Sequence, residues 1–179
     1  MAEVEVAETV MTRRIAELRQ RKATLYEMGG RDRVEKQHKQ GKLSARERVD
    51  ELLDGGSWQE MYGFARHRAT EFGMANKEIP ADAVVTGCGT IDGRLVTVAS
   101  QDFTSAGGAV GEVNADKIVE MAKYSLKTGS PFIVINDSGG ARIQEGIDAL
   151  AGYGRVFYHN TLLSGVVPQI SLVCGPCAG

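Results

Sequence analysis

Apolar residues near the start of the chain recur every three or four positions, with polar residues between them. This spacing puts them on one face of a helix, which we expect to run from about residue 9 to residue 28. Gly29-Gly30 follows and ends the pattern. The apolar positions are Met11, Ile15, Leu18 and Leu25.

The next segment is basic and is followed by a second helical signal. Five Lys and Arg residues fall between positions 31 and 42, which we interpret as a solvated helical face, with a phosphate site as the alternative. Ser44 and Glu47 have the spacing of a capping box. A short helix is therefore predicted after Ser44, ending at Gly55-Gly56.

After Pro80 the pattern changes to short β-rich runs. The runs 83–87 and 95–99 flank the tight-turn dipeptide Asp92-Gly93, so they predict a β-hairpin. Asn114 is expected to cap a helix that ends at residues 129–131.

Strands and helices alternate in the rest of the chain. Apolar runs at 132–135 and 170–173 predict two strands, and the helix between them has an apolar face. Strand, helix and strand in succession indicate an α/β fold with a parallel sheet and right-handed crossovers. The helix face is marked by Ile147, Leu150, Gly154, Phe157 and Thr161.

Composition and charge exclude some classes of protein. The 179 residues carry a formal net charge of −2, which allows one ordinary core and gives no bulk attraction for nucleic acid. The apolar runs are too short for a membrane span and the N-terminus is acidic, so we expect a cytoplasmic protein, or a mitochondrial matrix protein in a eukaryote, although no transit peptide is visible. Three cysteines form neither a disulfide framework nor a zinc set, so no metal is expected.

The stretch Asp137-Ser138-Gly139-Gly140 allows two interpretations. Ser138 could be a nucleophile of the trypsin type, but a serine nucleophile needs a general base and a group that orients it. The motif also follows a predicted parallel strand, unlike its place in an all-β protease. We prefer the second interpretation, in which the glycines let the backbone turn closely and present N–H groups as an oxyanion hole.

Cys174-Gly175-Pro176-Cys177 has the letters of the thioredoxin redox motif. A thiol-disulfide oxidoreductase is thus an alternative function, although the chain holds no supporting helix after the motif. Gly179 is expected to begin a helix whose first N–H groups lack internal partners. We also expect the chain to be the N-terminal part of a longer protein, because a central strand is rarely left uncovered.

Six segments, in order along the chain, resemble the carboxyltransferase (β) subunit of biotin-dependent acyl-CoA carboxylases, the group of the propionyl-CoA carboxylase β-chain and the methylmalonyl-CoA transcarboxylase. The resemblance implies a crotonase-like ββα spiral, with a helical arm at 1–57 and a partial N-terminal domain at 58–179. The matching segments are 34–38, 41–48, 80–82, 100–104, 137–146 and 175–179.

The resemblance also implies the chemistry, in which a carboxyl group moves between carboxybiotin and the α-carbon of an acyl-CoA. The implied enolate would be stabilised by backbone amides of Gly139, Gly140, Ala141 and Gly179. The implied coenzyme A pocket includes Ser105, Gly107, Gly108, Ala109 and Arg142.

The implied partners are an acyl-CoA, a biotin carboxyl carrier, a biotin carboxylase subunit and further copies of the chain in a hexamer. A biotin-dependent acyl-CoA decarboxylase uses the same subunit type and stays open, as does a fragment that only binds coenzyme A or assembles with partners. The isolated chain is expected to be inactive, because the second oxyanion loop is cut at Gly179.

Overall fold

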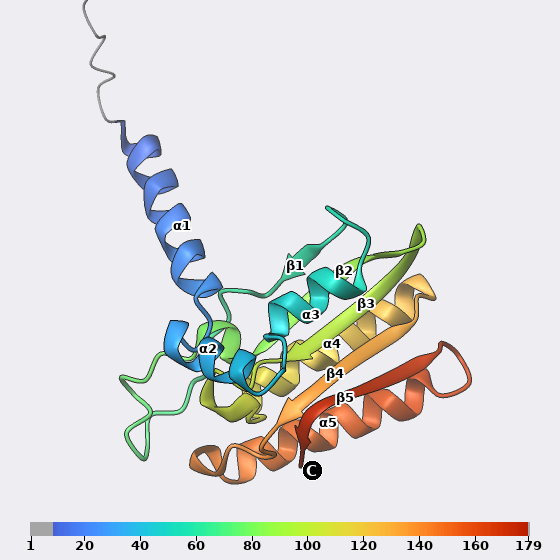
Figure 1. Ribbon diagram of the computed structural model, residues 1–179. Coiled ribbons are helices and arrows are strands. Elements are labelled where there is room, and N and C mark those ends of the chain that lie inside the picture. Colours follow the sequence, from blue (N-terminus) through green and yellow to red (C-terminus); the bar gives the residue numbers. More distant parts are fainter. Residues whose placement is uncertain (1–8, 179) are drawn as a thin grey trace, which may run out of the picture.

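A five-stranded sheet forms the centre of the computed structural model, which describes residues 9–178 (Figure 1). The first three strands pair antiparallel and the last three pair parallel. In spatial order the strands are β1 (Gln59–Met61), β2 (Val84–Ile91), β3 (Arg94–Gln101), β4 (Phe132–Ser138) and β5 (Gln169–Cys177).

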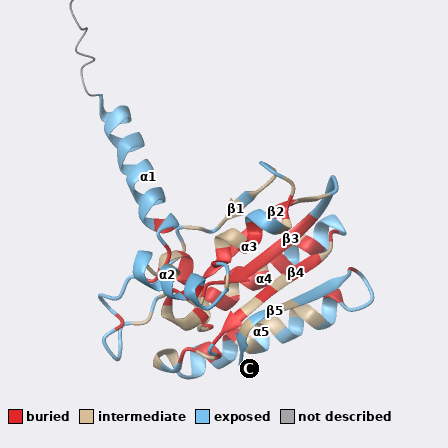
Figure 2. Cartoon of the chain, in the orientation of Figure 1, coloured by how far each residue is buried: buried red, intermediate tan, exposed pale blue. Residues whose placement is uncertain are grey.

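Helices cover the two faces of the sheet. The side chains of α3 (Ala45–Leu52) join a core with β3 and β4, around Val49 and Ile133. On the other face, α4 (Glu112–Thr128) packs its apolar side against Phe132. Successive side chains of a strand point to opposite faces, so the buried strands of the middle of the sheet serve both cores (Figure 2).

The predicted hairpin is confirmed. β2 and β3 pair along their whole length, from Val84 opposite Gln101 to Ile91 opposite Arg94. Asp92 and Gly93 have φ of 50° and 74°, as a two-residue hairpin turn with the twist of its strands requires. Together β2, β3 and α4 make a ββα unit, which β4 and α5 (Ile147–Leu163) extend.

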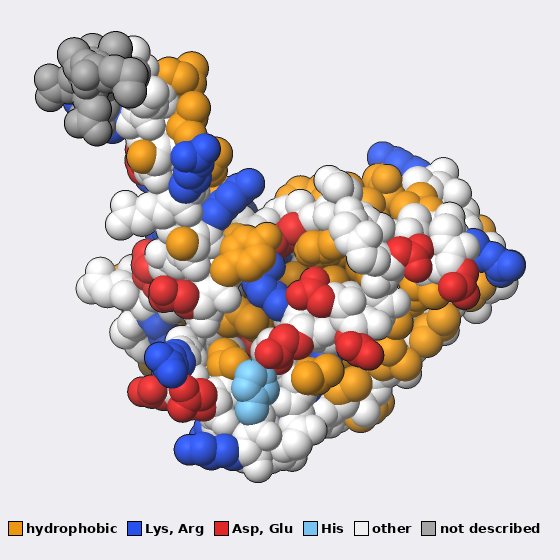
Figure 3. Space-filling model, turned by 45° about the horizontal axis from the view of Figure 1, so that its top comes forward, with side chains coloured by type: hydrophobic (Ala, Val, Ile, Leu, Met, Phe, Trp, Pro, Cys, Tyr) orange, Lys and Arg blue, Asp and Glu red, His pale blue; other side chains and the backbone are white. Residues whose placement is uncertain are grey.

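Three helices precede the sheet. α1 (Val10–Tyr26) and α3 are the predicted ones, and the capping box of Ser44 and Glu47 is confirmed. The basic run forms α2 (Arg31–Lys39), of which only Gln37 is buried. α1 projects from the body with most of its surface exposed, including the predicted apolar positions other than Leu25 (Figures 2 and 3). Whether the arm ends at residue 57 stays a prediction.

Two details of the helix predictions are wrong. α4 begins at Glu112, and Asn114 lies inside it, buried, because its amide donates to Asp82 O at 2.6 Å. In α5 the predicted apolar face is largely exposed, and the buried residues are Ala149, Gly152 and Leu163. The reason is close packing, since a Cβ on Gly152 would lie 2.7 Å from Ala115 Cβ.

Candidate functional site

Two loops meet at the carboxyl end of β4. The amide loop (residues 139–142) follows β4, and the glycine segment (residues 105–111) leads into α4. Gly139 N donates to Gly107 O, and Val110 N donates to Gly140 O, both at 2.9 Å. Arg142 N donates to Val110 O at 2.9 Å, so the two segments run side by side as a short parallel bridge.

The backbone donors of the amide loop are used unequally. Gly139 N and Arg142 N donate to the glycine segment, and Gly140 N donates to Ser138 Oγ at 3.1 Å. Ala141 N forms no hydrogen bond with any of the residues 9–178. An unused N–H in a structured loop is what an oxyanion site requires.

The direction of this N–H follows from the peptide that contains it. Gly140 O and Ala141 N–H belong to one planar trans peptide, so they point in opposite directions. Since Gly140 O accepts from Val110 N, the Ala141 N–H points away from the glycine segment. Gly140 itself has φ of 100°, a conformation that glycine adopts without strain.

The end of β5 lies against the amide loop. Ser138 pairs with Cys177, and Ala178 N donates to Ser138 O at 3.2 Å. A Cβ on Gly140 would lie 3.1 Å from Ala178 O. The structure therefore brings the two predicted oxyanion segments together up to Ala178, while the prediction for Gly179 lies outside the described residues.

The glycine segment approaches β4 very closely. A Cβ on Gly108 would lie 2.2 Å from Asp137 O, and φ is 65° at Gly107 and 64° at Gly108. Position 108 therefore requires glycine, because it combines a positive φ with no room for a Cβ. Ser105 is buried in this segment.

Nothing in the structure supports Ser138 as a nucleophile. Its side chain is buried, and its Oγ accepts a hydrogen bond from Gly140 N. A general base would have to lie within hydrogen-bond reach, yet each histidine contacts another group. These contacts are His38 with Glu47, His67 with Lys77 O, and His159 with Arg155 O.

The cysteine pair lacks the geometry of a redox site. Both Cys174 and Cys177 lie within β5, which extends beyond the predicted strand at 170–173, so neither cysteine lies at the start of a helix. The pairing of β5 with β4 shifts register across this stretch, and both cysteines are free thiols. A Cβ on Gly175, between them, would lie 2.0 Å from Asp137 Oδ1.

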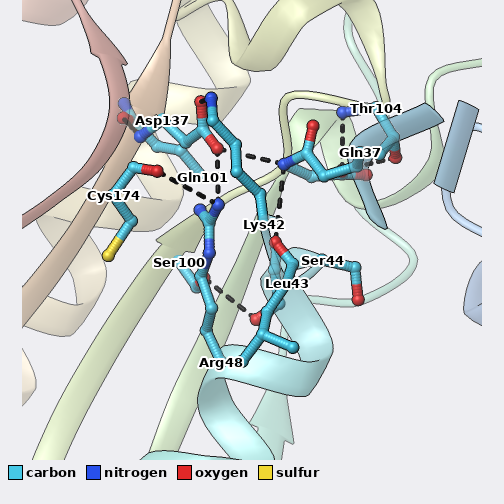
Figure 4. A network of polar contacts seen from close by, with 12 residues as sticks. Gln37, Lys42, Leu43, Ser44, Arg48, Ser100, Gln101, Thr104, Asp137 and Cys174 are labelled. Atoms are coloured by element: carbon cyan, nitrogen blue, oxygen red, sulfur yellow. Dashed lines mark hydrogen bonds and ion pairs between the residues drawn. The ribbon is translucent and has the colours of Figure 1, made fainter. Parts of the chain in front are cut away.

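A buried polar network centres on Asp137 (Figure 4). Its Oδ2 accepts from Arg48 Nη2 at 2.6 Å and from Gln37 Nε2 at 3.1 Å. Lys42 Nζ lies 3.9 Å from Oδ1, and Arg48 Nη2 also reaches Cys174 O at 3.4 Å. The network thus ties α2 and α3 to the ends of β4 and β5.

A second buried network contains Arg142. Its Nη1 donates to Asp82 Oδ1 at 2.6 Å and to Glu145 Oε1 at 2.8 Å, and its Nη2 donates to Ala109 O at 2.9 Å. Burial raises the pKa of Asp82, and the adjacent guanidinium opposes that rise. A coenzyme A contact for Arg142 stays a prediction.

Sequence reasoning missed most of these buried charges. Arg48 carries a usable signal, because Ala45, Arg48 and Leu52 share one face of α3 with the core residue Val49. A lone charge on an apolar helix face calls for a buried partner. Asp82 offers no such signal, since its neighbours in the sequence form no regular pattern.

A cavity of about 230 Å³ opens beside the amide loop. It lies between the parallel strands and α5, and apolar and amide side chains mix in its lining. Among residues 9–178 no group of His, Cys, Asp and Glu could hold a metal ion, and no described helix is long and apolar enough to cross a membrane. The lining includes Ser138, Tyr153, Phe157, Asn160 and Ala178.

The ββα units and the loops meeting at the carboxyl ends of parallel strands define a crotonase-like α/β fold, preceded by a helical arm. The transcarboxylase 12S crystal structure with methylmalonyl-coenzyme A and methylmalonic acid bound has the same fold, with a TM-score of 0.92, 53% identity, and coverage of 98% of this chain and 34% of that one. A Pseudomonas malonate decarboxylase hetero-tetramer is more distant, with a TM-score of 0.67, 27% identity, and coverage of 75% and 51%.

The family model of the carboxyl transferase domain matches residues 36–179, and the chain belongs to this family. It is 58% identical over 151 residues to the methylmalonyl-CoA decarboxylase subunit alpha of Veillonella parvula, covering 84% of this chain and 30% of that protein. It is 54% identical over 171 residues to the methylmalonyl-CoA carboxyltransferase 12S subunit of Propionibacterium freudenreichii subsp. shermanii, covering 96% and 33%.

The mitochondrial propionyl-CoA carboxylase beta chain of Mus musculus is 54% identical over 153 residues, covering 84% of this chain and 28% of that protein. The chain thus spans about a third of the length of the relatives it matches. These relatives are subunits of enzymes that are named for acyl-CoA substrates.

Proposed function

We propose that this chain supplies the acyl-CoA-binding, enolate-stabilising part of a biotin-dependent carboxyltransferase that acts on propionyl-CoA or methylmalonyl-CoA. Family membership and the names of the relatives support the reaction class and the substrates. The single observation that carries the mechanism is the unused Ala141 N–H at the carboxyl end of β4.

The reaction needs such a donor. Loss of the α-proton of an acyl thioester leaves a carbanion whose charge moves onto the thioester oxygen. That carbon would form the new C–C bond with the carboxyl group of carboxybiotin as the N–C bond of carboxybiotin breaks, and the freed biotin nitrogen would take up the α-proton. A donor aimed at the oxygen stabilises the enolate more than the neutral thioester, which lowers the barrier. Ala141 N–H is the proposed donor from the amide loop, and Gly179 N–H is the proposed donor from the segment after β5.

Carboxybiotin supplies the carboxyl group in this proposal, on a carrier that a biotin carboxylase subunit loads. None of the residues 9–178 is assigned to it, and its proposed seat is mainly a second domain of a neighbouring subunit. We propose a homo-oligomer, a hexamer by analogy with the hexamer assembly of the transcarboxylase 12S structure. The proposed compartment is the cytoplasm, or the mitochondrial matrix in a eukaryote.

The direction of transfer stays part of the proposal. One relative is named a carboxyltransferase and another a decarboxylase, and both reactions pass through an enolate of the same acyl-CoA. The amide loop serves either direction, because microscopic reversibility requires the same stabilisation of the enolate.

The test compares two substitutions in the full-length enzyme. Ala141→Pro removes the proposed donor, and we expect carboxyl transfer to propionyl-CoA to fall by about 10²–10³-fold. Ser138→Ala leaves Ala141 N–H in place, and we expect most of the activity to remain. Steady-state kinetics with a loaded biotin carrier measures both.

Two controls accompany these assays. Circular dichroism and propionyl-CoA binding must show that the Ala141→Pro protein is folded and binds its substrate. Full activity of a folded Ala141→Pro protein, or loss of activity with Ser138→Ala at unchanged substrate binding, would overturn the oxyanion assignment.

A further inference from the structure

A stretch of left-handed backbone lies next to the site. Ala81, Asp82 and Ala83 have φ of 50°, 49° and 62°, and each such residue other than glycine costs roughly 1–2 kcal/mol. Backbone of this kind persists only where its surroundings hold it in place. We call residues 81–83 the left-handed turn.

Two side chains of α4 and one backbone amide of the segment after β3 hold the left-handed turn. Lys117 Nζ donates to Ala81 O and to Val84 O, and Asn114 Nδ2 donates to Asp82 O at 2.6 Å. Asp102 N donates to Ala83 O at 2.9 Å. Every carbonyl from residue 81 to residue 83 therefore has a buried donor, and the turn is a rigid base for the Asp82 side chain.

From this base, Asp82 holds the guanidinium of Arg142. The side chains are 0% and 2% exposed, and Oδ1 lies 2.6 Å from Nη1. Glu145 shares Nη1 at 2.8 Å, and its other oxygen accepts from Glu112 N at 2.6 Å, at the first turn of α4. The positive end of the helix dipole helps to offset the second carboxylate.

The second terminal nitrogen of the Arg142 guanidinium, Nη2, reaches the glycine segment. Arg142 Nη2 donates to Ala109 O at 2.9 Å, and the next residue, Val110, holds Gly140 O through its N–H at 2.9 Å. That bond sets the plane of the 140–141 peptide and hence the direction of Ala141 N–H. Arg142 thus connects the rigid turn to the bond that orients the proposed donor.

We infer that Arg142 and Asp82 are a positioning pair, which fixes the direction of the Ala141 amide by clamping the glycine segment against the amide loop. The inference rests on the proposed function of that amide. It assigns no contact with coenzyme A to either side chain, whereas the resemblance implied a place for Arg142 in the coenzyme A pocket.

The test compares kcat and KM of variants of the full-length enzyme with those of the unsubstituted enzyme. Arg142→Lys keeps the positive charge but has a single ammonium group, which cannot reach Asp82, Glu145 and Ala109 O in the fork geometry. We expect kcat to fall by about 10²-fold, the effect of a misplacement of about 1 Å, with little change in KM for propionyl-CoA. Hydrogen exchange at residues 139–142 should become faster.

Arg46→Lys is the matched control. Arg46 also forms a fork with a carboxylate, at 2.8 and 2.9 Å from Glu60, and these side chains are 11% and 13% exposed. Neither residue contacts the amide loop. We expect the control to lower the unfolding temperature without changing kcat.

If Arg142→Lys fails to fold, Asp82→Asn is the second variant, because asparagine keeps the shape of the aspartate side chain and removes its charge. We expect it to lower kcat as well, and the double variant to lose no more than Arg142→Lys alone, because residues that act as a unit are not additive. The positioning role would be overturned by any of three results. These are an unchanged kcat, a change confined to KM, and losses in kcat that add up in the double variant. Loss of activity with Ala141→Pro alongside unchanged kcat in Arg142→Lys would remove this inference and leave the proposed function standing.

Discussion

Lys117 is a cation in the core, and no carboxylate of residues 9–178 lies in hydrogen-bond contact with it. It is 3% exposed and donates to two backbone carbonyls. Burial lowers its pKa to about 8, although Asp82 and Glu60 raise it in part. The neutral amine keeps two N–H groups, so it can keep both hydrogen bonds after it loses its proton.

This burial predicts an unusual dependence of stability on pH. Between about pH 8 and pH 10.5 the unfolded chain holds the Lys117 proton and the folded chain does not, so the free energy of unfolding rises with pH over this window. The gain is on the order of 3 kcal/mol in total, from 1.36 kcal/mol per pKa unit. Urea unfolding at a series of pH values should show the rise in the natural protein and its loss in Lys117→Met.

Lys123→Met serves as the control for this measurement. Lys123 lies on the same helix, its side chain is 46% exposed, and it pairs with Glu120. Its replacement should leave the rise in place. The same flattening in both variants would mean that Lys117 is not the group that titrates.

At the scale of elements, α5 contains a pair of glycines with opposite surroundings. A Cβ on Gly152 would lie 2.7 Å from Ala115 Cβ of α4, whereas a Cβ on Gly154 would meet nothing within 4 Å. We expect Gly152→Ala to destabilise by about 1–3 kcal/mol through overpacking. Gly154→Ala should stabilise by about 0.5–1 kcal/mol, because alanine favours the helix. Thermal unfolding of both variants decides, and equal effects would contradict the close contact of the two helices.

Elements with local signals could be predicted from the sequence, while their partners could not. Asp92-Gly93 specifies a hairpin through its own turn conformation, and the spacing of apolar residues located the helices. The face that α5 buries depends on small residues opposite Ala115 of another helix, which periodicity does not encode.

The candidate site shows the same division. The motif glycines marked the amide loop, since backbone that turns closely needs glycine. The ion pairs behind it join residues that are far apart in the sequence, 89 positions for Arg48 and Asp137 and 60 for Asp82 and Arg142. No local pattern reports such a pairing.

At the scale of the whole molecule, the buried contact between α1 and the body lies in the last turn of the helix, among residues 9–178. Leu25 is 8% exposed and contacts Gly63, whereas Leu18, two turns earlier on the same face, is 45% exposed. Leu25→Ala should cost about 2–5 kcal/mol, as for a buried leucine, and Leu18→Ala within about 0.5 kcal/mol. Urea unfolding of the 1–179 chain measures both. Equal losses would show that the projecting part of α1 packs against another surface in solution.

Two misleading motifs in this sequence have one physical origin. The carboxylate of Asp137 fills the space where a side chain at position 175 would begin. The aspartate that makes residues 137–140 look like a protease motif is therefore the reason for the glycine that makes residues 174–177 look like a redox motif. The residues at positions 137 and 175 therefore depend on each other across neighbouring strands. A relative with a side chain at position 175 is expected to have a residue smaller than aspartate at position 137.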